Sequence, residues 1–390
     1  MSAPRRIVMI VSASGTADPR VSKEAEALVA GGYEVVVIAW DREKRDPALI
    51  ERDGWRIEST GPAARHGAGL GNIGGYREFW RVARRRVAEL RPDAIHCDNL
   101  DTVPAALPLV NRTSGSPRLV LDFWEMYRHS RALPQSGIKG VIARAAARYL
   151  ERRSIPGAEV VITVGEGQVG YYRDLGARNI VLVENAPELE RYTPVEREEP
   201  DFVVSFIGQK RWAPALVNLM KAIQPYPHLR ALLVGGGPAE AEIARIAGTM
   251  ERVEVGGRFD PSETPSLYHR CDAVFACYDA SLENWRTAYP VKAMEAMACA
   301  LPLICTRGTF SGDYVERHGL GYAVDDHDPG DIARALVALE DDRAGAREMG
   351  RRGRAIVEAG LNWTAASARL VAAYDAMFEA NGVPLQSEGS

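Results

Sequence analysis

The sequence predicts an α/β protein with two Rossmann-like, doubly wound lobes that face each other across a cleft. Largely apolar segments of strand length, such as residues 6–12 (RIVMIVS) and 33–39 (YEVVVIA), alternate with segments of helical spacing. Strands buried on both faces are typical of parallel sheets covered by helices. The same alternation begins again at residues 202–208, and a chain of 390 residues is too long for one hydrophobic core.

The first lobe is expected to alternate strands and helices from residue 6 onward. Its first helix, at residues 21–30, should end at Gly31 and Gly32, because glycine commonly terminates helices. Further strands are predicted at residues 94–97, 118–122 and 159–164, and further helices at residues 76–90, 105–111 and 141–153.

The second lobe is expected to repeat this order. Its strands are predicted at residues 202–208, 230–234, 253–255, 273–276 and 302–305. Its helices are predicted at residues 213–223 and 239–249, with another that begins near Pro290. Two lobes of similar size follow from this pattern.

The boundary between the lobes should lie near residues 185–200, where prolines interrupt a charged run. We therefore expect one Rossmann-like domain over residues 1–190 and a second over residues 191–365. An amphipathic helix within residues 366–380 is expected to pack back on the first domain, and the polar tail 381–390 is expected to be disordered.

Composition excludes several classes of protein. The net charge of −4 argues against a dedicated nucleic-acid binder. The five cysteines are odd in number and contain no C-x-x-C pair, so we interpret them as reduced thiols of a cytoplasmic protein. No signal peptide is evident, and no segment reaches the roughly 18 apolar residues that a membrane span needs.

Candidate ligand-binding residues follow the strands of the first lobe, because ligands in open α/β sheets bind beyond the carboxyl ends of strands. Gly15 lies in the loop after the first strand, where a glycine allows close approach of the backbone to a ligand. Asp98 and Glu125 follow two later strands. These three are the predicted catalytic positions. For the carboxylates at 98 and 101, helix capping is favoured over metal binding.

Cations and glycines follow the strands of the second lobe. Gly208, Lys210 and Arg211 occupy a strand-to-helix turn, where a small residue followed by two cations suits a phosphate group. Ser311 and Gly312 lie in a second glycine-bearing turn, whose backbone N–H groups are further phosphate candidates.

A cation and a carboxylate lie three residues apart at the start of the helix near residue 290. Lys292 and Glu295 therefore share one helix face. A glutamate at this position can accept hydrogen bonds from both hydroxyls of a ribose. The second lobe thus predicts a diphosphate clamp with a ribose contact.

Several motifs resemble the GT-B glycosyltransferases, most closely their large retaining family 4. Residues 289–302 (YPVKAMEAMACALP) resemble the signature P-x-K-x-x-E-x-x-A-x-G-x-P. Residues 18–21 (DPRV) and 31–35 (GGYEV) are similar to the start of these proteins, and residues 91–98 (RPDAIHCD) and 206–211 (FIGQKR) resemble two internal segments. The resemblance runs from about residue 6 to residue 380.

The resemblance implies a retaining hexosyl or amino-sugar transferase with a nucleotide-sugar donor. Arg211 and Lys292 would contact the donor phosphates and Glu295 the ribose, in place of a metal ion. The leaving phosphate would assist attack on the same face of the sugar, so that the protein mainly positions reactants and stabilises charge. The acceptor would be a small molecule, a glycan or a lipid-linked sugar, and no other cofactor is expected.

Three departures from the family pattern leave alternatives open. Thr287 stands where relatives often carry a second glutamate, Ala300 replaces a glycine, and Trp124 replaces a histidine that contacts the donor sugar. A nucleotide-sugar 2-epimerase and a non-catalytic partner subunit of the same fold are therefore the alternative functions. The basic helix at residues 76–90 raises a peripheral membrane contact, although a solvated surface helix is the favoured interpretation.

Overall fold

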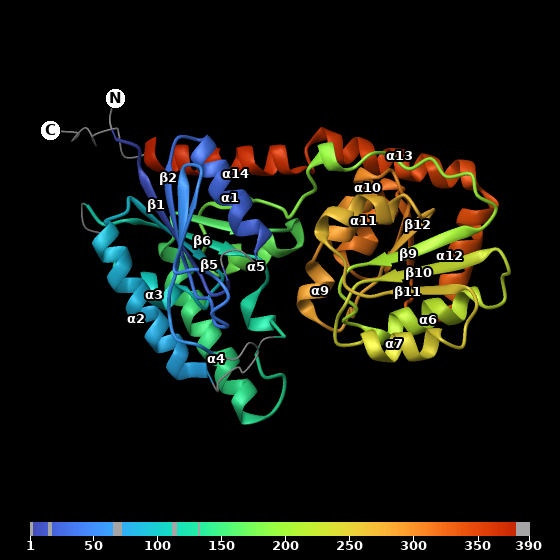
Figure 1. Cartoon of the computed structure of the whole chain (residues 1–390), viewed down its shortest axis with the longest axis horizontal. Coiled ribbons are helices and arrows are strands. Elements are labelled where there is room, and N and C mark those ends of the chain that lie inside the picture. The colour runs from blue at the N-terminus through green and yellow to red at the C-terminus, as the bar shows by residue number, and fades with distance from the viewer. Residues whose placement is uncertain (1–2, 15–17, 65–71, 111–114, 132, 380–390) are drawn as a thin grey trace. The chain divides into compact units, whose positions relative to one another are not determined.

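The computed structural model describes residues 3–14, 18–64, 72–110, 115–131 and 133–379 (Figure 1). The chain divides into two compact units, Met1–Val183 with Ala366–Ser390 and Glu184–Ala365. Each unit is built on one largely parallel sheet covered by helices, which confirms the predicted fold class. The predicted catalytic residue Gly15 and the tail at 381–390 lie outside the described residues.

Unit 1 contains an eight-stranded sheet in the order β3-β4-β2-β1-β5-β6-β7-β8. All neighbours pair in parallel except β3 and β4, which form an antiparallel edge hairpin. The strands are β1 (Arg6–Val11), β2 (Glu34–Ala39), β3 (Leu49–Arg52), β4 (Trp55–Ser59), β5 (Ala94–Asp98), β6 (Arg118–Phe123), β7 (Val160–Thr163) and β8 (Ile180–Leu182).

The helices of unit 1 cover both faces of this sheet, as its doubly apolar strands require. Figure 1 shows α2 and α4 on one side and α1 with α14 on the other. The helices are α1 (Pro19–Ala30), α2 (Ile73–Leu90), α3 (Val103–Ala106), α4 (Gly137–Ser154), α5 (Val169–Asp174) and α14 (Trp363–Glu379).

The last helix, α14, is tied to unit 1 by polar and aromatic contacts. The Tyr374 hydroxyl lies 2.8 Å from Nδ1 of His96, and the Tyr33 hydroxyl lies 2.5 Å from Asp375. Arg369 also donates to the backbone oxygen of Leu182. These contacts join residues far apart in the sequence.

Unit 2 contains a six-stranded, fully parallel sheet in the order β11-β10-β9-β12-β13-β14. The chain runs outward from β9 to one edge and then returns to β12 to build the other half. This is the Rossmann arrangement, with its switch point between β9 and β12. The strands are β9 (Phe202–Ile207), β10 (Leu229–Val234), β11 (Val253–Gly256), β12 (Ala273–Ala276), β13 (Leu303–Thr306) and β14 (Gly321–Val324).

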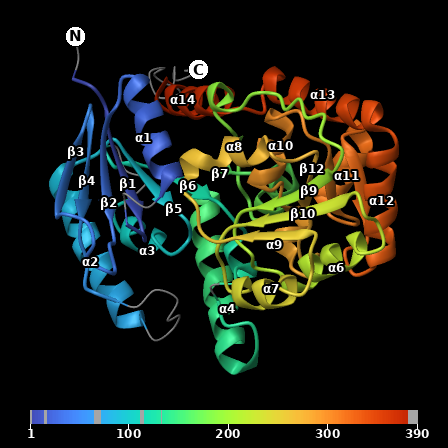
Figure 2. The same ribbon diagram turned by 45° about the vertical axis from the view of Figure 1, so that its right-hand side comes forward.

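Helices α6, α7 and α12 cover one face of the second sheet, and α8, α10 and α11 cover the other (Figure 2). Their bounds are α6 (Ala213–Ile223), α7 (Glu240–Ala247), α8 (Thr264–Tyr268), α9 (Glu283–Thr287), α10 (Val291–Ala298), α11 (Phe310–His318), α12 (Pro329–Asp341) and α13 (Arg343–Ala359).

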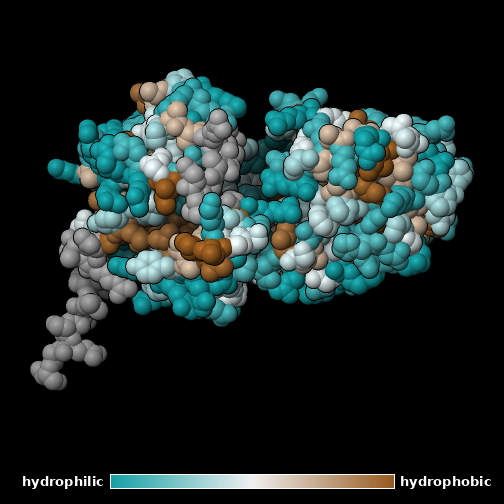
Figure 3. Space-filling model, turned by 90° about the horizontal axis from the view of Figure 1, so that it is seen from below, coloured by the Kyte–Doolittle hydropathy of each residue, from teal (hydrophilic) through white to brown (hydrophobic). Residues whose placement is uncertain are grey.

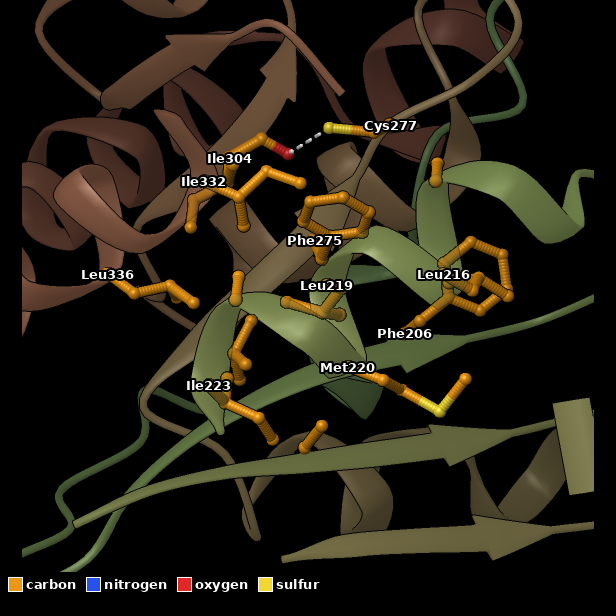
Figure 4. Packing of buried hydrophobic residues seen from close by; sticks show 14 of the residues in the cluster. Phe206, Leu216, Leu219, Met220, Ile223, Phe275, Cys277, Ile304, Ile332 and Leu336 are labelled. Carbon is orange, nitrogen blue, oxygen red and sulfur yellow. Dashed lines mark hydrogen bonds between the residues drawn. The ribbon is translucent and has the colours of Figure 1, made fainter. Parts of the chain in front are cut away.

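The hydrophobic core of unit 2 extends to the carboxyl end of its sheet. Figure 4 shows Leu219 of α6 packed below Phe275 of β12, with Phe206 of β9 beside Leu216. Phe206 is the penultimate residue of β9, so its ring reaches the carboxyl end of the sheet.

Some elements differ from the sequence prediction. The helix expected at 105–111 is only the short α3, which Leu107 ends. The edge strand β3 was missed because its residues are mostly exposed and lack an alternating apolar pattern. Among the described helices, none is long and apolar enough to cross a membrane.

Candidate functional site

The predicted donor residues of unit 2 gather where the order of the sheet reverses. Gly208 follows β9, Tyr278 follows β12, and Lys292 and Glu295 lie on α10, which packs against β12 and β13. Ligands of open α/β sheets bind outside the carboxyl ends of strands at such a switch point. The topology therefore places these residues where a nucleotide is usually held.

Lys292 carries a buried ammonium group. Its Nζ lies 3.0 Å from the centre of the Phe206 ring and 5.1 Å from that of Tyr278. Within the described residues, this Nζ has no hydrogen-bond acceptor. Burial lowers the pKa of Lys292 well below its ordinary value, although the nearby Glu295 opposes this change. A buried cation without an acceptor is costly unless a ligand supplies negative charge.

Glu295 is held by two tyrosines. Its carboxylate accepts hydrogen bonds from the hydroxyls of Tyr192 at 2.8 Å and Tyr268 at 3.0 Å. Burial raises the pKa of Glu295, while these two hydrogen bonds and the charge of Lys292 act in the opposite direction. Each carboxylate oxygen can accept more than one hydrogen bond, so this group is oriented and retains acceptor capacity.

Arg211 and Gly208 complete this group of residues. Arg211 is exposed, donates to the Gln209 side chain at 2.7 Å, and its charge acts on the hydroxyl of Tyr278. Gly208 has a φ of +132°, and a Cβ there would lie 3.5 Å from Nζ of Lys292. The glycine thus leaves open the space beside the buried ammonium.

Lys210 differs from its prediction as a phosphate ligand. Its side chain is buried, and its ammonium donates to the backbone oxygens of Gly235 and, at 2.6 Å, of Gly256. Adjacent side chains after a strand point in different directions, so Arg211 faces solvent while Lys210 turns inward. Lys210 therefore connects the turns that follow β9 and β10 with the last residue of β11.

The turn that contains Ser311 and Gly312 is closed by its own side chains. Thr309 is the N-cap of α11, and its hydroxyl accepts the Gly312 N–H at 3.1 Å. The Ser311 hydroxyl lies 3.1 Å from that of Thr309 and is buried. The Gly312 N–H is thus not available to a phosphate, contrary to the expectation that the N–H groups of this turn are free.

Unit 1 contains a buried ionic cluster at the carboxyl ends of β5 and β6. Arg20 donates to both oxygens of Asp122, at 2.8 and 2.9 Å, and lies 2.8 Å from Glu24. Burial raises the pKa of Asp122, but the charge of Arg20 and the hydrogen bonds from His96 and Arg20 together outweigh it, so the pKa is lowered overall. Burial raises the pKa of Glu24, and the charge of Arg20 only partly offsets this.

Asp98 lies inside this cluster. One oxygen is 3.7 Å from Nε2 of His96, and neither oxygen has a hydrogen-bond partner among the described residues. Burial, followed by the charges of Glu24 and Asp122, raises the pKa of Asp98 well above its ordinary value. Asp98 caps no helix, because the N-cap of α3 is Thr102. The capping interpretation is therefore wrong for Asp98.

His96 is a buried strand residue, as expected. Its Nε2 lies 3.6 to 3.8 Å from carboxylate oxygens of Glu24, Asp98 and Asp122. The ligand atoms of these four residues lie within 4.8 Å of one another, so in the described part of the chain they are the group that could hold a metal ion.

Trp124 and Glu125 follow β6 at the edge of the cluster. The indole N–H of Trp124 donates to Asp122 at 2.9 Å, so it contacts the same carboxylate that Arg20 holds. Glu125 is half-buried, and its backbone oxygen accepts from the Tyr172 hydroxyl at 3.1 Å. In unit 2, Thr287 donates back to the backbone of Glu283 at 3.0 Å, within its own helix.

A large surface cavity lies elsewhere in unit 1. It has a volume of about 600 Å³ and is lined by residues of β3, β4 and α2. Four arginines line it, and each is paired with a glutamate: Arg86, for example, lies 2.6 Å from Glu58 and 3.0 Å from Glu89. Because these arginines already have carboxylate partners, the cavity is a weaker candidate for binding an anion than the surroundings of Lys292.

Comparison with protein families matches both halves of the chain. Residues 15–186 match the Glycosyl transferase 4-like domain, and residues 201–342 match Glycosyl transferases group 1. The chain belongs to the family 4 GT-B glycosyltransferases. The resemblance noted from the motifs is thereby confirmed.

Curated relatives of this glycosyltransferase include D-inositol 3-phosphate glycosyltransferases. That of Corynebacterium kroppenstedtii is 24% identical over 261 residues, 57% of this chain and 56% of the relative. That of Corynebacterium glutamicum is 26% identical over 259 residues, 59% of this chain and 60% of the relative. The match to these relatives thus spans a little over half of their length.

Solved structures share the fold of the whole chain. Sucrose-phosphate synthase from Thermosynechococcus elongatus has a TM-score of 0.79 at 19% identity and covers 97% of this chain and 100% of its own. Anabaena HepE, solved in complex with UDP-glucose, has a TM-score of 0.68 at 16% identity and covers 95% and 99%.

Sequence reasoning missed the aromatic residues of this candidate site. Tyr192 and Tyr268 orient Glu295, and Phe206 and Tyr278 surround the Lys292 ammonium. Tyr192 lies about a hundred positions before Glu295 in the sequence, so no local spacing connects them. Only the folded topology brings them together.

Proposed function

We propose that this chain transfers a hexosyl or amino-sugar unit from a nucleotide-sugar to an acceptor, with retention of anomeric configuration. The observation that carries the proposal is the buried ammonium of Lys292, which has no acceptor among the described residues. Gly208 leaves space beside it, and Glu295 lies one helical turn away. A nucleoside diphosphate supplies both the charge and the ribose hydroxyls that these groups suit.

We propose that Arg211 and Lys292 bind the donor diphosphate and that Glu295 accepts hydrogen bonds from its ribose. As the bond between sugar and phosphate breaks, negative charge develops on the leaving diphosphate. Fixed cations beside that charge stabilise the transition state more than the ground state. This arrangement needs no strong protein base and no metal ion at the donor.

UDP is the proposed nucleotide, supported by HepE, which was solved with UDP-glucose. The acceptor is proposed to be a small molecule, a glycan or a lipid-linked sugar. The D-inositol 3-phosphate glycosyltransferases among the relatives favour the first. Glu125, half-buried and close after β6, is the proposed acceptor contact, and Asp98 is a positioning residue. Five buried free cysteines support a cytoplasmic location.

The test incubates the purified chain with UDP-, GDP- and ADP-sugars, with and without sugar and inositol phosphate acceptors. Acceptor-dependent release of nucleotide, with product anomers assigned by NMR, supports a retaining transferase. Interconversion of the donor sugar without an acceptor would identify an epimerase instead. Absence of binding to every nucleotide would identify a non-catalytic subunit, and Lys292→Met serves as the inactive control.

A further inference from the structure

Helix α4 presents large apolar side chains to solvent. Ile138 is 80% exposed, Val141 62%, Ile142 57% and Tyr149 68%. These four account for most of the exposed large hydrophobic residues of the described chain. Figure 3, viewed from the side on which α4 protrudes in Figure 1, shows hydrophobic side chains gathered on this part of unit 1.

The spacing along α4 is that of an amphipathic helix with its apolar stripe turned outward. Positions 138, 141, 142, 145 and 149 recur at intervals of three and four residues, and so lie on one face. The face toward unit 1 is instead lined by small or polar residues, namely Gly140, Ala143, Ala147, Glu151 and Ser154. The helix therefore packs without using its largest apolar side chains.

Cations flank the exposed stripe on both sides. Lys139, Arg148, Arg152 and Arg153 are exposed. The charge of Arg148 also acts on the buried Glu151. The one acidic residue of α4, Glu151, is buried and accepts a hydrogen bond from Tyr171 at 2.8 Å. The outer face is thus apolar and uniformly positive.

The other basic helix of unit 1 provides an internal contrast. In α2, Arg81 pairs with Glu78 and Arg85 pairs with Glu89. Its apolar residues Phe79 and Val87 are buried in the core. The interpretation of α2 as a surface helix with solvated arginines therefore agrees with the structure, and α2 offers no docking face.

We propose that the outer face of α4, defined by Ile138, Val141, Ile142 and Tyr149 with the flanking cations, docks on an anionic phospholipid surface. A helix with such a face lies in the plane of the headgroups, with its apolar side chains inserted and its cations near lipid phosphates. Long arginine side chains reach the headgroups while their stems stay in apolar surroundings. A protein partner would need an apolar groove with acidic residues along both of its edges to match the two rows of cations. An anionic bilayer presents negative headgroups on both sides of the inserted helix, however the helix is oriented in the membrane plane.

The test measures flotation of the full chain with vesicles of phosphatidylcholine alone and of phosphatidylcholine with phosphatidylglycerol. The wild type should bind the anionic vesicles, and binding should weaken as salt is raised. The double variants Ile138→Ser/Ile142→Ser and Arg152→Glu/Arg153→Glu should each reduce the partition coefficient by about tenfold or more. The controls Leu49→Ser and Arg77→Glu, on exposed residues outside α4, should bind as the wild type does.

Thermal melts verify that every variant is folded, and nucleotide affinity, measured in solution, should be unchanged in all of them. Failure of the wild type to bind anionic vesicles would overturn the proposal, as would equal losses in the controls and the α4 variants. Self-association that the Ile138→Ser/Ile142→Ser variant abolishes, without vesicle binding, would assign the face to a second copy of the chain and also overturn it.

Discussion

The Nζ atom of Lys292 lies 3.0 Å from the centre of the Phe206 ring. The electron-rich face of the ring attracts the ammonium in a cation–π interaction. It does not replace a hydrogen-bond acceptor, and none is present for this Nζ in the described residues. The ligand-free protein therefore carries an electrostatic cost at the point where the sheet order reverses. We interpret this cost as offset by the bound diphosphate.

Replacing Lys292 by methionine should stabilise the ligand-free protein. Methionine keeps the apolar stem against Phe206 and removes the buried charge, so the free energy of unfolding should rise by about 1 to 4 kcal/mol. Chemical denaturation without nucleotide measures the change. A loss of stability of similar size would mean that the ammonium has a structural partner.

The stability gained by Lys292→Met should depend on pH. Because the pKa of Lys292 is lowered in the folded state, the unfolded chain binds more protons between that pKa and the ordinary value of 10.5. The free energy of unfolding of the wild type should therefore rise with pH in this window relative to the variant. Chemical denaturation of both proteins at pH values from 7 upward, about one unit apart, measures how the free energy of unfolding changes with pH. Parallel pH profiles would contradict the buried ammonium.

Glu295→Gln should weaken the binding of nucleotides but not of inorganic pyrophosphate. The amide replaces one of the two carboxylate oxygens that the ribose hydroxyls would use, so UDP affinity should fall by about ten- to a hundredfold. Pyrophosphate has no ribose, so its affinity should stay within about threefold. Calorimetric titration of both ligands gives the comparison. Equal losses for both would assign Glu295 to the phosphates or to the packing of α10.

Lys210 and Arg211 should behave in opposite ways although they are adjacent. Lys210→Met removes the ammonium that donates to the backbone oxygens of Gly235 and Gly256, and Gly256 keeps only the Gly235 N–H, so stability should fall by about 2 to 3 kcal/mol. Arg211→Ala should leave stability nearly unchanged and reduce UDP affinity by about tenfold. Melting temperatures and UDP titrations of the two variants separate these roles. Loss of affinity in the folded Lys210→Met protein with none in Arg211→Ala would reverse the assignment.

Asp98→Asn should alter the pH dependence of stability. The folded Asp98 keeps its proton above the ordinary pKa of 3.8, so the free energy of unfolding of the wild type falls as pH rises toward the raised pKa. The variant lacks this loss, which amounts to about 1.4 kcal/mol for each pH unit of the window. Denaturation between about pH 5 and 8 tests this. A destabilisation that does not vary with pH would show that a charged Asp98 holds the cluster together.

Much of the fold could be predicted because parallel strands are apolar on both faces and glycines mark helix ends. The helix α6 was predicted at its observed bounds, Ala213–Ile223, and β12 likewise at Ala273–Ala276. The edge strand β3 could not be predicted, since its exposed residues show no period.

The residue types of the candidate site could be predicted, but not their directions. The sequence predicted both Lys210 and Arg211 as phosphate ligands, with Arg211 favoured because adjacent side chains after a strand point in different directions. The folded turn shows that the lysine is the one that turns inward. Asp98 was predicted at the end of its strand, but no local pattern connects it with Arg20, which lies far earlier in the chain and forms a buried cluster beside it.

Calorimetric titration of UDP into the wild type and Lys292→Met tests the central claim most directly. The variant should lose at least about thirtyfold in affinity while its ligand-free stability rises, because the same ammonium that costs folding energy attracts the diphosphate. Lys292→Arg should retain part of the affinity, since it keeps the charge. Wild-type affinity in a folded Lys292→Met protein would show that the diphosphate binds elsewhere and would contradict the donor site proposed for this chain.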